Sequence, residues 1–130
     1  MTEYVILFND EWVPLHTLEQ LQEKSRRSRE VIDDMAAAGV LVYANGGIDT
    51  STAAFSVVAA DGDLVFTDGP YVETKEHVGG FTVVEVPDEA AARYWAGRLA
   101  AALEWPQEVH PFGARFEVPE RFRVAAGEGE

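Results

Sequence analysis

Two apolar segments that enclose a polar connector limit the possible folds of this chain most strongly. One ends at Val65-Phe66 and the other spans residues 81–86, and both have the β-branched and aromatic character of strands. Between them, Asp68-Gly69-Pro70 is typical of a turn, while Gly79-Gly80 would let the chain re-enter the sheet where a side chain would clash. We expect such a connector to hold polar groups at the mouth of a sheet.

The other segments give the order strand, helix, strand, hairpin, strand, helix, strand. One helix should begin after Thr17, which forms a capping box with Gln20, and end before Gly39. The second should begin after Asp88 and stop before Trp105. The predicted strands are residues 4–8, 40–43, 53–59, 64–66, 81–86 and 107–112. This order predicts an α+β, ferredoxin-like fold, with two helices on one face of a mostly antiparallel sheet.

The apolar face of the first helix is interrupted by two polar residues. Leucine, isoleucine and methionine recur at spacings of three and four, but Ser25 and Ser28 occupy the middle of this stripe. Either the helix faces something smaller or wetter than a closed core at this point, or the serines are close-packing positions.

Length and composition indicate one domain over residues 1–124, followed by a flexible acidic tail at 125–130. The chain has 23 acidic and 10 basic residues, a net charge of −13, which disfavours nucleic acid and anionic membranes as partners. It contains no cysteine, which excludes thiolate chemistry and fits a cytoplasmic protein. No apolar run approaches the roughly 20 residues that span a bilayer, and no signal peptide is evident. With both helices on one sheet face, the other face needs cover, which predicts a homodimer.

The sequence resembles the YCII-related family, in particular its branch named for a DGPF motif. The residues that carry this resemblance are 4–8, 38–42, 67–76 (Thr-Asp-Gly-Pro-Tyr-Val-Glu-Thr-Lys-Glu), 78–81, 88–90 and 108–111. The resemblance implies a ferredoxin-like fold of the dimeric α/β-barrel kind, with a cleft between helices and sheet. Tyr71 departs from the motif, where phenylalanine is usual. Related proteins include a dehydrochlorinase that uses a His–Asp pair, and many are encoded beside extracytoplasmic-function sigma factors.

The candidate site lies in and around the central connector. Asp68 is the candidate base or orienting acid, with His16 or His77 as the proton carrier. The candidate ligand-binding residues are Gly69, Pro70, Tyr71, Glu73 and Lys75. The alternative for Asp68 is a structural role in capping the turn, with Glu73 and Lys75 paired at the surface. The three histidines lack metal-ligand spacing, so neither a metal nor another cofactor is expected.

A basic cluster on the first helix consists of Lys24, Arg26, Arg27 and Arg29. Glu23 and Glu30 lie beside it, which predicts a solvated, salt-bridged face rather than a nucleic-acid site.

Three functions remain open from the sequence. The first is cofactor-free proton transfer or elimination on a small cyclic or aromatic molecule. The second is a non-catalytic, ligand-sensing accessory module associated with those sigma factors. The third is a purely structural dimer. The sequence identifies neither the ligand nor whether the protein is an enzyme.

Overall fold

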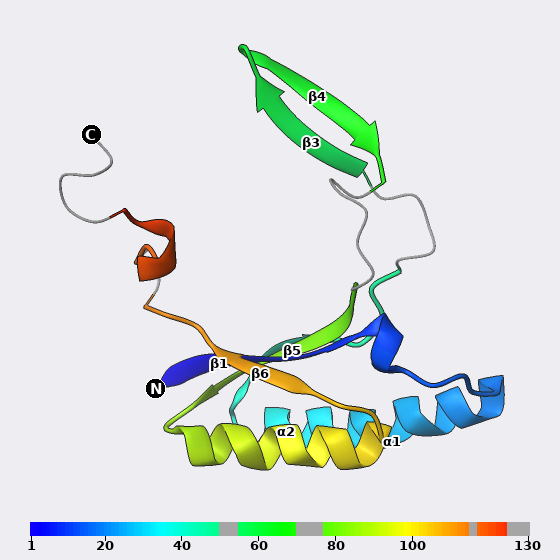
Figure 1. The fold of residues 1–130 in the computed structure, drawn as a ribbon. Coiled ribbons are helices and arrows are strands. Elements are labelled where there is room, and N and C mark those ends of the chain that lie inside the picture. The colour runs from blue at the N-terminus through cyan, green and yellow to red at the C-terminus, as the bar shows by residue number, and fades with distance from the viewer. Residues whose placement is uncertain (50–54, 70–76, 115–116, 125–130) are drawn as a thin grey trace.

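The computed structural model describes residues 1–49, 55–69, 77–114 and 117–124 (Figure 1). Its elements in chain order are β1 (Thr2–Asn9), the short 3-10 helix η1 (Asp10–Trp12), α1 (Leu18–Ala37), β2 (Leu41–Asn45), β3 (Phe55–Ala60), β4 (Asp63–Asp68), β5 (Val78–Val86), α2 (Glu89–Leu103), β6 (Glu108–Pro111) and the 3-10 helix η2 (Glu120–Phe122). The predicted tail at 125–130 lies outside the described residues.

The main sheet has four strands in the order β2-β5-β1-β6, and every neighbouring pair is antiparallel. Both helices lie against the same face of this sheet (Figure 1). The predicted α+β, ferredoxin-like arrangement is therefore confirmed. The expected dimer is not tested by a single chain.

The core lies between the sheet and the two helices. Alternation along the strands points Ile6, Val84 and Val86 toward the helices, where all three are fully buried. They meet Met35 of α1 and a face of α2 that includes Trp95. Three alanines of α2, Ala92, Ala96 and Ala102, belong to the same core.

Side chains of α1 and α2 bind one another at two places along the described helices. Arg98 Nη2 lies 2.5 Å from Asp34 Oδ2. Nearer the end of α2, Arg27 donates to Glu104 Oε1 at 2.7 Å and to the Ala101 carbonyl at 2.9 Å. Glu104 ends α2 in the left-handed conformation, with φ of 63°. The arginines thus fix how the two helices lie relative to one another.

The predicted helix ends are confirmed. Gln20 N–H donates to Thr17 Oγ1 at 3.1 Å, and Thr17 N–H donates to Gln20 Oε1 at 2.9 Å, which completes the capping box. Asp88 caps α2 by accepting from Ala91 N–H at 2.9 Å. Gly39, with φ of +73°, follows α1 in a conformation that favours glycine.

The predicted close approach at Gly79-Gly80 is also confirmed. A Cβ atom on Gly80 would lie 2.6 Å from the Cα of Gly46. Since the neighbouring atom belongs to the backbone, a side chain at this position could not be accommodated by rotation alone. Gly80 thus lets the segment that follows β2 pack against β5, whereas a Cβ atom on Gly79 would meet the side chains of Asp10 and Phe8.

The hairpin β3–β4 is separate from the main sheet, which the sequence pattern did not reveal. Its strands pair only with each other among the described strands, from Phe55↔Asp68 to Ala60↔Asp63. The turn uses Asp61 and Gly62, both with positive φ, as the hairpin signal predicted. Figure 1 shows the hairpin projecting away from the helix-covered sheet.

Candidate functional site

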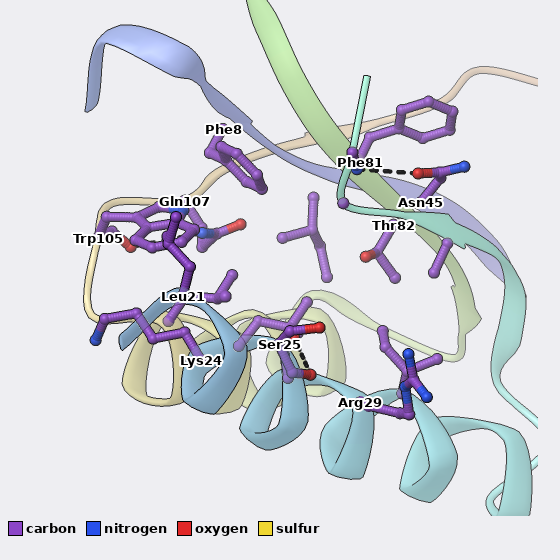
Figure 2. A pocket seen from close by; sticks show the side chains of 18 residues that line it. Phe8, Leu21, Lys24, Ser25, Arg29, Asn45, Phe81, Thr82, Trp105 and Gln107 are labelled. Atoms are coloured by element: carbon purple, nitrogen blue, oxygen red, sulfur yellow. Dashed lines mark hydrogen bonds between the residues drawn. The ribbon is translucent and has the colours of Figure 1, made fainter. Parts of the chain in front are cut away.

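A cavity of about 500 Å³ lies between α1 and the main sheet (Figure 2). This volume falls within the range of small-molecule binding sites. Its apolar wall is formed chiefly by residues from β1, both helices and the segment after α2: Ile6, Phe8, Leu21, Ile32, Leu99, Leu103 and Trp105. The cleft between helices and sheet that the family resemblance implied is thus present.

Five neutral polar side chains also line the cavity: Ser25, Ser28, Asn45, Thr82 and Gln107. The two serines belong to the interrupted apolar stripe of α1. Their position resolves the alternative left open by the sequence, because α1 faces a cavity rather than a closed core at this point. Hydroxyl and amide groups can orient a ligand through hydrogen bonds within an otherwise apolar site.

Asn45, the last residue of β2, forms part of the cavity wall. Its Oδ1 accepts a hydrogen bond from Gly47 N–H at 2.9 Å, which closes a tight turn around Gly46 (Figure 2). Gly46 in turn lies against Gly80 of β5. This wall is therefore held by backbone contacts as well as by the strand pairing of β2 with β5.

Among the described residues, the charged side chains that line the cavity are those of Lys24 and Arg29 of α1. The Lys24 side chain is only 12% exposed and its Nζ lies 3.4 Å from Glu104 Oε1. Arg29 has no ion-pair partner within the described residues. No carboxylate or imidazole is among the described residues that line the cavity. The electrostatic environment of the cavity therefore favours a neutral or negatively charged ligand.

The basic cluster of α1 is divided between two roles. Arg26 bonds Glu23 and Glu30, at 2.5 Å and 2.6 Å, on the solvated face that the sequence predicted. Lys24 and Arg27 both reach Glu104, and these two cations lower the pKa of that carboxyl, the hydrogen bond from Arg27 being the larger cause. Sequence analysis missed that Lys24 and Arg29 line a cavity, because spacing along a helix does not show what lies opposite it.

The structure places Asp68 at the end of β4, exposed to solvent. It is not among the residues that line the cavity. Gly69 follows with φ of +88°, and its carbonyl accepts a hydrogen bond from Ser56 Oγ at 2.6 Å. The other candidate ligand-binding residues, Pro70, Tyr71, Glu73 and Lys75, lie outside the described residues.

His77 is bound to Glu11 of η1, a residue that sequence analysis did not single out. The Glu11 carboxylate lies 2.8 Å from His77 Nδ1 and accepts the His77 backbone N–H at 3.1 Å. The hydrogen bond from the His77 side chain lowers the pKa of Glu11, and the backbone hydrogen bond contributes less. The contact joins residues 66 positions apart, so local sequence patterns carry no signal for it.

His16 lies just before α1, with its ring centroid 5.8 Å from that of Trp105. Its Nδ1 is buried, and so is Trp105 Nε1, and neither has a hydrogen-bond partner in the described part of the chain. His16 borders a second, more polar hollow with Lys24, Arg27 and Glu104. The observed contacts of the two candidate proton carriers are thus with Trp105 and Glu11 rather than with Asp68, and their catalytic role stays a prediction.

Two further observations concern metal binding and membrane spanning. The groups of histidine and acidic residues in the described ranges include none that could hold a metal ion. Within those same ranges, no helix is both long and apolar enough to cross a membrane.

Fold and cavity together define a ferredoxin-like α+β domain with a ligand-sized cleft between its helices and its sheet. The model of the YCII-related domain matches residues 2–104, from β1 through the end of α2. The chain therefore belongs to the YCII-related family. No curated protein matches the sequence.

Proposed function

We propose that this YCII-related protein binds a small, partly apolar, neutral or anionic molecule in the cavity between α1 and the sheet. The cavity itself carries this proposal, because its size suits a small ligand and its lining combines apolar side chains, hydroxyl and amide groups, and two cations. A ligand with a ring and one carboxylate or phenolate would match each of these features.

The proposed role is ligand sensing rather than acid–base catalysis. A general acid or base has to lie within hydrogen-bond reach of the reacting proton, directly or through one water. Among the described residues that line the cavity, none is an aspartate, glutamate or histidine. This composition supports the non-catalytic accessory module. The Thr67-Asp68-Gly69 motif further supports placing the protein in the DGPF branch, which suggests a link to extracytoplasmic-function sigma factors.

The test is ligand binding by variants that fill the cavity or remove a positive charge from its lining. The probes are 1-naphthoate, the neutral 1-naphthamide and the cationic 1-naphthylmethylamine, with binding measured by thermal shift and by tryptophan fluorescence. Wild type should be stabilised by naphthoate, less by the amide and not by the amine, because bound ligand stabilises only the folded state. Ser28→Leu should abolish the shift by filling the cavity, and Arg29→Gln should weaken naphthoate more than naphthamide.

The matched control substitutions are in α1 and α2, at residues that do not line the cavity. Gln22→Leu adds an apolar side chain to an exposed position of α1, and Arg93→Gln removes an exposed arginine of α2. Both should bind naphthoate like wild type. The proposal fails if none of the probes stabilises wild type, or if Ser28→Leu binds them unchanged.

A second candidate function is proton transfer that uses Asp68 with His16 or His77. The observation in its favour is the Glu11–His77 pair, because a carboxylate bound to Nδ1 orients an imidazole whose Nε2 can exchange protons. If this function is correct, Asp68→Asn should abolish turnover of a chlorinated hydroxyquinol while the Tm barely changes. Unchanged turnover, or equal losses of stability and turnover, would exclude a catalytic role for Asp68.

A further inference from the structure

Lys24 and Arg29 lie on opposite flanks of the α1 face that borders the cavity. An α-helix turns by about 100° and rises by about 1.5 Å per residue, so the two positions are about 140° apart around the axis and about 7.5 Å apart along it. Figure 2 shows Lys24 on the side of Trp105 and Arg29 on the side of Asn45. The two cations are therefore at different ends of the cavity, and the uncharged lining residues of α1 lie between them: Leu21, Ser25, Ser28 and Ile32.

At its end of the cavity, Lys24 belongs to a charge cluster with Arg27 and Glu104. Lys24 Nζ lies 3.4 Å from Glu104 Oε1, which is longer than a usual N–H···O hydrogen bond. Arg27 Nη1 donates to the same oxygen at 2.7 Å, and this bond is the largest cause of the lowered pKa of Glu104. Two cations around one carboxylate leave one positive charge in excess. This charge lies beside the cavity, because Lys24 lines it.

Two other carboxylates, Glu19 and Glu23, border the second hollow together with Lys24, but neither lines the cavity. Glu23 binds Arg26 at 2.5 Å on the solvated face of α1. Glu19 lies in the first turn of α1, where the positive end of the helix dipole stabilises a carboxylate. Among the described residues, the ion pair of Lys24 is thus with Glu104.

Lys24 can turn from Glu104 to a ligand at a small cost in free energy. Arg27 would still hold Glu104 through its 2.7 Å hydrogen bond, so no carboxylate would be left unpaired. The lysine side chain is only 12% exposed, and an ion pair away from bulk water is screened less than one at the surface. An ammonium group on a flexible four-carbon chain can also move without a change in the backbone. Lys24 is therefore suited to bind an anion inside the cavity.

Arg29 supplies the positive charge at the other end of the cavity, from an exposed position on α1. A guanidinium group binds a carboxylate through two parallel hydrogen bonds, which give direction as well as affinity. The whole chain carries a net charge of −13, so two cations on one cavity oppose the average charge of the molecule. This local positive charge favours a ligand with more than one negative group.

The apolar wall of the cavity is suited to an aromatic ring. Phe8 and Trp105 line it with ring centroids 5.4 Å apart at an angle of 66°, an edge-to-face arrangement. Leu99 and Leu103 of α2 add aliphatic surface. A flat, rigid ring system can pack against such faces and edges with little loss of conformational freedom on binding.

We propose that the ligand is an aromatic dianion with one negative group at each end of a rigid ring system. A carboxylate or phenolate binds Arg29, the rings pack against the wall that contains Phe8 and Trp105, and a second such group binds Lys24. This inference rests on the proposed ligand cavity and adds the second anionic group. It makes Lys24 the residue that distinguishes dianions from monoanions.

Calorimetry with two matched probes tests the second anionic group. Naphthalene-2,6-dicarboxylate has a carboxylate at each end, and its monomethyl ester has the same ring system and nearly the same length but a single charge. Isothermal titration calorimetry of the full chain at neutral pH and low ionic strength measures both affinities. Wild type should bind the dicarboxylate about tenfold or more tightly than the ester, because a charged hydrogen bond to Lys24 replaces a contact with a neutral group. Added salt should reduce this preference.

Two substitutions at the ion pair separate a ligand contact from a structural role. Lys24→Met keeps an unbranched side chain without the charge, so it should reduce the affinity for the dicarboxylate to that for the ester and leave the ester affinity unchanged. Glu104→Gln removes the charged partner of Lys24 and should tighten binding of the dicarboxylate. If the pair only maintained the fold, both substitutions would weaken both probes alike. Circular dichroism confirms that each variant is folded.

The outcomes distinguish this inference from the proposed function. Equal binding of the two probes by wild type, or parallel losses for both probes in Lys24→Met, would overturn the dianionic ligand and leave the cavity as a binding site. Failure of wild type to bind either probe would overturn both.

Discussion

The Glu11–His77 contact ties η1 to the start of β5 through one carboxylate. Both side chains are partly exposed, so solvent screens their interaction and its contribution to stability is modest. The contact is nevertheless bidentate, since Glu11 receives both the backbone and the ring of His77. It holds the end of the connector that contains the candidate motif.

We expect Glu11→Gln to lower the Tm at neutral pH and to have less effect in acid. The folded protein lowers the pKa of Glu11, so its carboxylate stabilises the fold above the unfolded-state pKa. That stabilisation is lost as the pH falls through the lower, folded-state value. Thermal unfolding from pH 7 to pH 3 should show the wild-type and Glu11→Gln curves converging. A pH-independent difference between wild type and Glu11→Gln would refute this explanation.

Gly80 is a residue at which a segment distant in sequence, around Gly46, leaves no room for a side chain. We expect Gly80→Ala to destabilise the protein by about 1–3 kcal/mol, because its Cβ would force the backbone around Gly46 to move. Gly97, in the middle of α2, has open space around it, so Gly97→Ala should stabilise by about 0.5–1 kcal/mol. Urea unfolding measures both changes. Equal changes in the free energy of unfolding for the two substitutions would show that the contact with Gly46 does not determine the effect of Gly80→Ala.

At the scale of the elements, α1 has a well-capped N-terminus, but only part of its apolar face is buried in the core. Its capping box satisfies backbone donors at the N-terminus. Only Val31 and Met35 of its residues are buried, because the middle of the helix borders the cavity. Helix α2 buries six residues, which makes it the main packing partner of the sheet.

We expect Thr17→Ala to lower the free energy of unfolding by about 1 kcal/mol, because it removes the hydroxyl that accepts Gln20 N–H. Thr17→Ser keeps that hydroxyl and should leave the free energy of unfolding nearly unchanged, because serine caps helices at least as well as threonine. Chemical denaturation monitored by circular dichroism compares the two variants. Similar losses for alanine and serine would mean that packing of the threonine methyl, and not the cap, stabilises the helix.

At the scale of the whole molecule, the helix-covered sheet and the hairpin are energetically distinct. All of the buried hydrophobic residues in the described ranges belong to the helix-covered sheet and the segments beside it. The hairpin contributes none, although it contains many of the exposed large hydrophobic side chains.

Replacing residues 55–68 by a short Gly/Ser linker should therefore leave a cooperatively folded domain. We expect near-wild-type near-ultraviolet circular dichroism, because the tryptophans lie outside the hairpin. Loss of cooperative unfolding would show that the hairpin stabilises the main core.

The candidate site was only partly predictable. Ser25 and Ser28 stand out in the sequence because they interrupt a periodic apolar stripe. Asn45, Thr82 and Gln107 gave no comparable signal, since each lies in or beside a strand and meets the others only through the fold. The sequence motif drew attention to Asp68 instead, which lies on the exposed hairpin.

The sequence by itself determined the helices, their caps, most strands and the α+β class, because periodicity, capping and turn preferences act between residues close in the chain. Only the tertiary structure decided that α1 borders a cavity, that Glu11 holds His77 and that the hairpin stays outside the main sheet. Each of these depends on contacts between segments far apart in sequence, whose free energies no local pattern records.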